Sequence, residues 1–148
     1  DKYDSTVLYG LEAGKYRLAL KTPKDQIINV EYTRDKSKKK AAYKKSKAIH
    51  LKSDIDSIYT STEKAARWYK VSVKSSKKQS KLKILTVADQ GGFKFTIYER
   101  GKKKPVKTVK TSAKHLEKTV KLPKKKGMYY VKVSKRTKKT NGYYEIKK

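Results

Sequence analysis

Apolar and polar side chains alternate with a period of two along much of this chain, most clearly at its C-terminal end. Such a period with one apolar side is typical of an antiparallel strand that is buried on one face. Two runs of this kind, residues 127–135 and 142–147, flank an Asn-Gly turn signal, which predicts a closing β-hairpin. Lysine is frequent on the polar side. The apolar set consists of Tyr129, Val131, Val133, Tyr144 and Ile146.

Similar short runs recur through the rest of the sequence, separated by turn signals. They cover residues 15–21, 26–33, 47–52, 67–74, 81–87, 93–97 and 116–122. Many short strands at this spacing predict an all-β fold, an antiparallel β-sandwich of jelly-roll-like type. In the run at residues 81–87 the apolar phase shifts after Ile84 toward Leu85 and Val87, which indicates a β-bulge.

Three lysine-dense stretches interrupt the alternation. We expect residues 34–47 to be an exposed connection with some helix, and residues 74–81 and 101–107 to be solvated hairpin tips. Lysine at strand edges also prevents edge-to-edge pairing with other chains.

A length of 148 residues suits one domain, so we expect residues 1–148 to form a single sandwich. Residues 11–32 nevertheless resemble residues 122–147. Each stretch holds a leucine, a glycine-marked turn, a Tyr-x-aliphatic-x-aliphatic strand and a returning strand. Residues 1–47 would therefore either complete the sandwich or belong to a preceding partial repeat.

The chain is strongly basic, with 42 Lys and Arg against 13 Asp and Glu and a net charge of +29. Lysine dominates, because the arginines are only Arg17, Arg34, Arg67, Arg100 and Arg136. Arginine supplies the planar fork that reads base edges, whereas lysine is a hydrated point charge. The composition therefore favours diffuse attraction to polyanions over sequence-specific readout.

The chain has no cysteine, which excludes disulfides and thiolate zinc sites. No apolar run approaches the length of a membrane span. The sequence begins at Asp1 rather than Met, and we expect that a signal peptide has been removed. Together these features predict an extracellular or cell-surface protein, from a Gram-positive bacterium.

Few residues in the sequence could form a catalytic site. His50 and His115 are the only histidines, and both lie on the polar side of their runs. A triad would need Ser112 and Glu117 beside one of them, and no nucleophile-elbow motif accompanies these residues. We expect no enzyme activity and no cofactor.

Aromatic and lysine side chains share the polar side of several predicted strands. Such a surface can stack sugar rings or other planar groups while lysines hold an anionic backbone. The alternative is that aromatics favour the pleated surface and lysine stems cover them. The candidate ligand-binding residues are Trp68, Lys70, Tyr98, Tyr130, Lys132 and Tyr143.

Four of these runs, in order, resemble a known family. They are residues 67–73, 93–98, 127–133 and 142–146, within a region that spans residues 48–148. Their Trp-Tyr-Lys, Phe-x-Ile-Tyr, Gly-x-Tyr-Tyr and Tyr-x-Ile patterns are similar to those of the bacterial pre-peptidase C-terminal domain, a relative of the collagen-binding domain of clostridial collagenases.

The resemblance implies an accessory, non-catalytic β-sandwich attached to secreted enzymes and surface proteins. Two departures stand out. Arg67 lies where the family usually has an acid, and the acidic clusters that bind calcium in some members are missing. Asp54 and Asp56 come nearest, but two carboxylates do not make a calcium cage, so we expect no metal site.

The sequence therefore predicts a binding module for an extracellular anionic or extended polymer, such as an anionic polysaccharide, cell-wall teichoic acid or a matrix protein. One alternative is a structural spacer or assembly module without a ligand. Another is non-specific binding of nucleic acid, although the chain lacks the arginine content and motifs typical of that function.

Overall fold

A computed structural model describes residues 7, 9–22, 24, 27–36, 40–52, 54–88, 90–113 and 116–148. Within this part of the chain the only helical segment is a short 3-10 turn, so the all-β prediction is confirmed. The elements are η1 (Lys45–Lys47), β1 (Ile49–His50), β2 (Ile55–Tyr59), β3 (Arg67–Val73), β4 (Lys81–Val87), β5 (Phe93–Glu99), β6 (Lys107–Lys110), β7 (Leu116–Lys121), β8 (Gly127–Lys135) and β9 (Gly142–Lys147).

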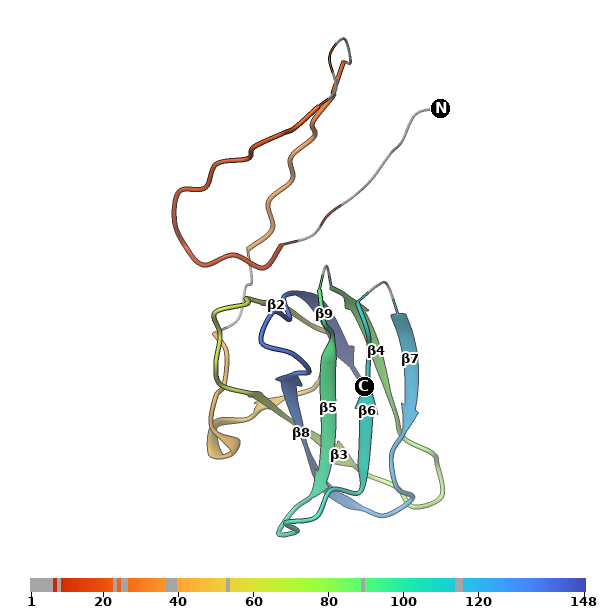
Figure 1. The fold of residues 1–148 in the computed structure, drawn as a ribbon. Coiled ribbons are helices and arrows are strands. Elements are labelled where there is room, and N and C mark those ends of the chain that lie inside the picture. The colour runs from red at the N-terminus through yellow and green to blue at the C-terminus, as the bar shows by residue number, and fades with distance from the viewer. Residues whose placement is uncertain are drawn as a thin grey trace.

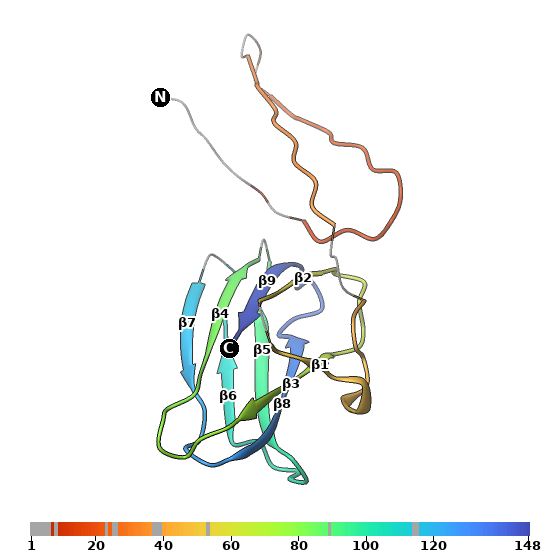
Figure 2. The same ribbon diagram turned by 180° about the vertical axis from the view of Figure 1, so that it is seen from behind.

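The strands form two sheets that face each other (Figure 1). Sheet A has the order β1-β3-β8-β5-β6, and sheet B has the order β2-β9-β4-β7. All pairs are antiparallel except β1 with β3, and Figure 2 shows β1 beside β3 from behind. From β2 onward each strand lies in the opposite sheet from the one before it, apart from β5 and β6. This is the nested arrangement of a jelly roll, as predicted.

The two closing strands do not form the hairpin that their sequence predicts. β8 pairs with β3 and β5 in sheet A, whereas β9 pairs with β2 and β4 in sheet B. The segment between them is therefore an arch from one sheet to the other. The same holds for residues 74–81, which join β3 to β4, while residues 101–107 do form a hairpin between β5 and β6.

The space between the sheets is filled by aromatic and branched side chains. Tyr69 and Tyr144 meet at its centre, where their hydroxyl oxygens lie 2.5 Å apart. Ser57 Oγ lies 2.9 Å from the Tyr69 hydroxyl and extends this buried chain. Each buried tyrosine thus contributes apolar area while its hydroxyl keeps a partner. The largest fully buried rings are Tyr59, Tyr69, Tyr129, Tyr144, Phe93 and Phe95.

The predicted bulge in β4 is absent. Its register runs without a break from Lys81 opposite Lys121 to Thr86 opposite Leu116. Thr86 takes the inward position after Ile84 and is fully buried, which leaves Leu85 on the outer face. The sequence suggested a phase shift because a threonine occupies the core here, and its Oγ1 has no hydrogen-bond partner among the described residues.

Arg67 supports the sandwich from within. It is buried at the start of β3, where its Nε and Nη2 donate to the Glu63 carboxylate at 2.7 and 2.8 Å. Nη2 also donates to the Ile58 carbonyl at 2.6 Å, and the guanidinium lies 4.9 Å from the centre of the Tyr59 ring. Burial opposes the charge, but the bonds with Glu63 raise the arginine's pKa above its ordinary value. At the position where the resembled family usually has an acid, this chain therefore has an arginine that belongs to a buried ion pair.

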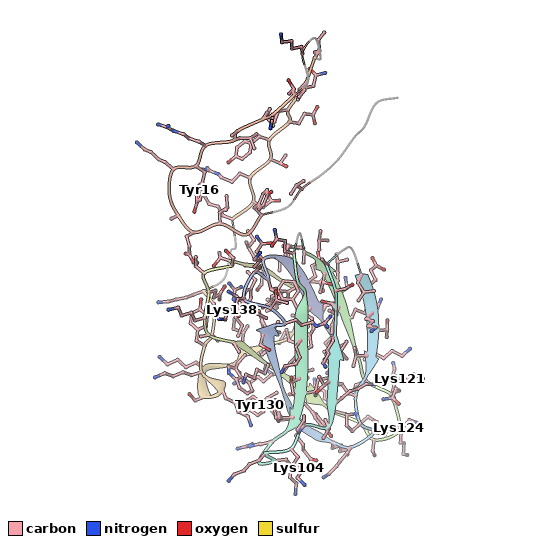
Figure 3. All side chains as sticks on the ribbon, viewed as in Figure 1. Tyr16, Lys104, Lys121, Lys124, Tyr130 and Lys138 are labelled. Carbon is pink, nitrogen blue, oxygen red and sulfur yellow. The ribbon has the colours of Figure 1, made fainter. Side chains whose placement is uncertain are left out.

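Residues 9–22 and 27–36 form an N-terminal arm that stands away from both sheets (Figures 1 and 3). The strands predicted at residues 15–21 and 26–33 are wrong for the described part of the arm, which contains no strand. Its apolar side chains are exposed, and Figure 3 shows Tyr16 in the open loop of the arm. An isolated pair of strands gains too little burial to order itself in water, which explains the irregular chain.

The arm is fastened to the sandwich at its root. Gly10 is buried against Tyr59, so closely that a Cβ there would come within 2.2 Å of the Tyr59 carbonyl oxygen. Two residues later, Glu12 accepts hydrogen bonds from the hydroxyls of Thr60 and Thr62 at 2.9 and 2.8 Å. These bonds lower the pKa of the Glu12 carboxyl.

Candidate functional site

The outer face of sheet A gathers most of the aromatic and basic residues that the sequence singles out. Residues that are directly opposite in antiparallel strands point to the same side, so the register defines rows across the sheet. One row contains Trp68, Lys132 and Thr96, and the next contains Lys70, Tyr130 and Tyr98. Five of the six candidate residues therefore share two adjacent rows.

Three aromatic side chains in these rows surround a single ammonium group. The rings of Trp68 and Tyr98 lie 5.9 Å apart, and we call these two rings and that of Tyr130 the aromatic platform. Lys45 Nζ lies 4.9 Å from the centre of the Tyr130 ring, 5.5 Å from that of Tyr98 and 5.9 Å from that of Trp68. A cation over the negative face of a ring is stabilised by about 0.5–2 kcal/mol, depending on desolvation.

Backbone pairing explains why Lys45 reaches the platform. It belongs to η1, a turn closed by the Lys47 amide donating to the Lys44 carbonyl at 3.0 Å. Just before this turn, the Trp68 amide donates to the Ala42 carbonyl at 2.7 Å, and after it the Leu51 amide donates to the Lys70 carbonyl at 2.8 Å. The segment is thus tied to β3 at both ends.

The charge on this face has one sign. Within the described strands of sheet A the sole acid is Glu99, at the end of β5, and it forms an ion pair with Lys125 at 2.5 Å. The outward positions carry additional lysines instead: Lys94 lies opposite Lys110, and Lys132 Nζ lies 5.7 Å from the Trp68 ring. Glu99 lies opposite the inward Tyr129, so the outward positions of the described strands present cations and rings without a carboxylate.

Sheet B has a different outer face. Asp56, Glu145, Leu85 and Glu117 form one row across its four strands. A groove of about 460 Å³ runs beside them and includes Lys83 in its lining. Carboxylates and lysines alternate here, which makes this face less suited to a polyanion than sheet A.

Tyr143 is the candidate that the structure does not bring to the platform. It lies in β9 of sheet B, opposite Ile58 and Val87. Its hydroxyl donates to Glu145 Oε1 at 3.1 Å. Burial, followed by hydrogen bonding and charge from Asp56 and Glu145, raises the pKa of Tyr143.

The histidines offer no catalytic arrangement within the described residues. His50 lies on sheet A, where Ser72 Oγ is 3.2 Å from its Nε2. Burial first, and then charges from four lysines that begin with Lys52, lower the pKa of His50. Glu117 lies on sheet B, and His115 lies outside the described residues. The described part of the chain contains no group of three or more acids or histidines that could hold a metal ion.

Lys45 is the site residue that sequence reasoning did not find. It lies in a lysine-dense connection, and no period or motif distinguishes it from its neighbours. Only the hydrogen bonds between its flanking backbone and β3 distinguish Lys45, and these are tertiary contacts that the local sequence does not reveal.

No helix in the described residues is long and apolar enough to cross a membrane.

Comparisons with known proteins found similar solved structures but no matching family. No protein-family model matches the chain, and no curated protein does. Among solved structures it is similar to the pre-peptidase C-terminal domain of collagenase from Bacillus anthracis, with 19% identity and a TM-score of 0.49, over 68% of this chain and 90% of that one. It is also similar to a carbohydrate-binding module of Cellvibrio mixtus lichenase 5A in complex with cellotriose, with 16% identity and a TM-score of 0.36, over 70% of this chain and 93% of that one.

At these values neither likeness carries a ligand or an activity over to this chain. The first of the two structures is a domain of the kind whose strand motifs the sequence resembles.

Proposed function

We propose that the outer face of sheet A binds an extended anionic polymer outside the cell, of the class of acidic polysaccharides and teichoic acids. The observation that supports this function is Lys45 held over the aromatic platform, on a face whose outward positions in the described strands carry no acid. The chain would act as a non-catalytic binding module.

Each part of the face has a distinct role in this proposal. The rings of Trp68 and Tyr98 offer apolar surfaces on which a sugar ring can stack. Lys45 and Lys132, both held beside these rings, pair with the anionic groups of the polymer. Lys70 and Lys94 extend the positive charge along the sheet and attract further repeats of the polymer.

The chain supplies its own reporter for this function, because Trp68 is its only tryptophan. Titration with heparin is expected to change Trp68 fluorescence, and the logarithm of the binding constant should fall linearly with the logarithm of the salt concentration. Retention on heparin no stronger than that of a small basic control protein at physiological salt would contradict the proposal.

Two tyrosine exchanges test whether binding depends on the rings of sheet A. Tyr130→Ala should weaken heparin binding about tenfold, which corresponds to about 1.4 kcal/mol, because it removes the ring nearest Lys45. Tyr143→Ala is the matched control on sheet B and should leave binding unchanged. Equal effects of the two exchanges, or none, would favour a spacer without a ligand on this face.

The role of the lysines is tested by the salt slope, the slope of the logarithm of the heparin-binding constant against the logarithm of the salt concentration. Lys132→Gln should lower the slope by about one, as expected for the loss of one ionic contact. Lys104→Gln, at the tip of the β5–β6 hairpin in Figure 3, should leave the slope nearly unchanged. Competition between DNA and teichoic acid at equal phosphate concentration completes the test. Equal displacement by both would indicate non-specific polyanion binding.

A further inference from the structure

The N-terminal arm carries the pattern of the most deeply buried strand of the sandwich. When Gly14 is aligned with Gly127, the apolar residues of the arm fall on those of β8, whose inward side chains Tyr129, Val131 and Val133 are fully buried. Their counterparts in the arm lie in solvent, and Leu18 is 71% exposed. The pairs are Tyr16 with Tyr129, Leu18 with Val131, and Leu20 with Val133.

The second half of the arm matches β9 in the same way. When Glu31 is aligned with Glu145, Val30 falls on Tyr144 and Tyr32 falls on Ile146. Tyr144 and Ile146 are completely buried, whereas Tyr32 is 78% exposed. The arm therefore repeats the order of both closing strands.

We infer that residues 14–33 are the closing β-arch of a second sandwich of this topology, and that they become strands when they enter it. In the described sandwich, β8 lies between β3 and β5, and β9 lies between β2 and β4. If the arm takes the positions of β8 and β9 in such a sandwich, each of its two strands is hydrogen-bonded on both edges. On its own it has no neighbouring strands, which accounts for an extended chain that forms no ladder.

The topology also indicates where the remaining strands of the second sandwich lie in the sequence. The arch is the last part of the jelly roll, so the other strands of the second unit would precede residue 14 in the same polypeptide. The sandwich of residues 42–148 already contains both of its own central strands, so neither it nor a second copy has a vacant place for the arm. The partner is a sandwich unit that lacks its last two strands.

The root of the arm would then be the junction between two units. Gly10 packs on Tyr59, and Glu12 bonds with Thr60 and Thr62, all within four residues of the start of the arch. This junction is held by direct contacts, so the two units would have a fixed rather than a free orientation. The outward positions of Tyr130 and Lys132 correspond to Arg17 and Ala19 in the arm, so the second unit would not repeat the aromatic platform.

A fusion protein tests the inference. A copy of residues 40–121 with Trp68→Phe is placed directly ahead of Tyr9 of the chain, which supplies strands β1–β7 to the arm and retains Gly10. Hydrogen exchange of residues 14–22 and 27–36 should be fast in the 148-residue chain and about a hundredfold slower in the fusion, because strand amides exchange only on opening. Trp68 of the second half reports that its own sandwich stays folded.

Two substitutions make the test specific. Leu18→Asp in the fusion should abolish the slowing, because Leu18 takes the place of a fully buried valine. Ala19→Asp, on the outward side, should retain it. Fast exchange in the fusion itself, or equal behaviour of the two variants, would overturn the inference.

A reciprocal exchange guards against a fusion that fails to fold for another reason. Residues 14–22 replace Gly127–Lys135 in the 148-residue chain, nine residues for nine. Cooperative unfolding should persist, whereas a scrambled version of the nine residues should lose it. Loss with both sequences would also overturn the inference. So would self-association of the unmodified chain that Leu18→Asp prevents, because the partner would then be a second copy.

Discussion

At the scale of single residues, the ion pair of Arg67 with Glu63 is a buried interaction whose loss should destabilise the fold strongly. Both side chains are less than 10% exposed, and the pair is bidentate. Removing one partner leaves a buried charge without compensation, so Arg67→Met should lower the free energy of unfolding by about 3–5 kcal/mol. Urea denaturation measures this change. Arg100→Met, an exposed arginine, is the control and should stay within about 0.5 kcal/mol.

His50 gives a second prediction at this scale. Its pKa is lowered by burial and by neighbouring lysines, so its NMR titration midpoint should fall below 6.5. The unfolded state then binds the proton more readily than the folded state. The contribution of His50 to stability is therefore complete above about pH 6.5 and is lost as the pH falls through the lowered pKa.

Salt separates the two causes of this shift. Raising sodium chloride from about 0.05 to about 0.5 M shortens the screening length and should move the midpoint upward, because it weakens the lysine charges and not the burial. The resonance is assigned with His50→Gln. A midpoint at or above 6.5 at low salt would contradict the prediction.

At the scale of elements, the start of β9 depends on a glycine. Gly142 has a φ of +130°, and a Cβ there would lie 2.3 Å from the Val87 carbonyl oxygen. Gly101 has a φ of +77°, but a Cβ there would meet no described atom within 4 Å. Gly101→Ala should therefore cost about 1 kcal/mol from the backbone alone. Gly142→Ala should cost about 2 kcal/mol more because it also forces β9 away from β4. Thermal unfolding of the two variants checks this, and equal costs would contradict it.

Strand positions could be predicted from the alternation of side chains, but strand partners could not. The inward sides of β8 and β9 face the same core from opposite sheets, so an arch and a hairpin have the same alternation. β6 was not predicted, because of its four residues only Val109 is buried. In β4 the buried Thr86 interrupts the apolar alternation, and this produced the same sequence pattern as a β-bulge.

The arm shows the converse limit. Its side chains alternate as in a strand, but the described part of the arm contains no strand. A period of two shows which side of a segment is apolar and does not show whether a neighbouring strand is present to pair with it. The aromatic platform followed from the alternation, because Trp68, Tyr98 and Tyr130 fell on the outward side of their strands. Their mutual contact and the place of Lys45 depended on sheet order, which alternation does not encode.

At the scale of the whole molecule, the net charge of +29 should make stability depend on salt. Like charges repel within the folded chain, and sodium chloride screens them, so the melting temperature should rise with salt. The variant with Lys102, Lys103 and Lys104 all changed to Glu loses six units of positive charge at one exposed hairpin tip, which should flatten this dependence. Calorimetry at several chloride concentrations measures both slopes, and a melting temperature that falls with salt would contradict the prediction.

The position of β9 also governs how the molecule would bear tension. β9 is the last strand of the chain, yet it lies in the middle of sheet B, between β2 and β4. Force applied at Lys148 along the axis of β9 would load both of its ladders in shear, so the bonds on both sides would resist together. An edge strand would instead peel away one bond at a time. We therefore expect β9 to withstand force along its own axis better than an edge strand such as β7.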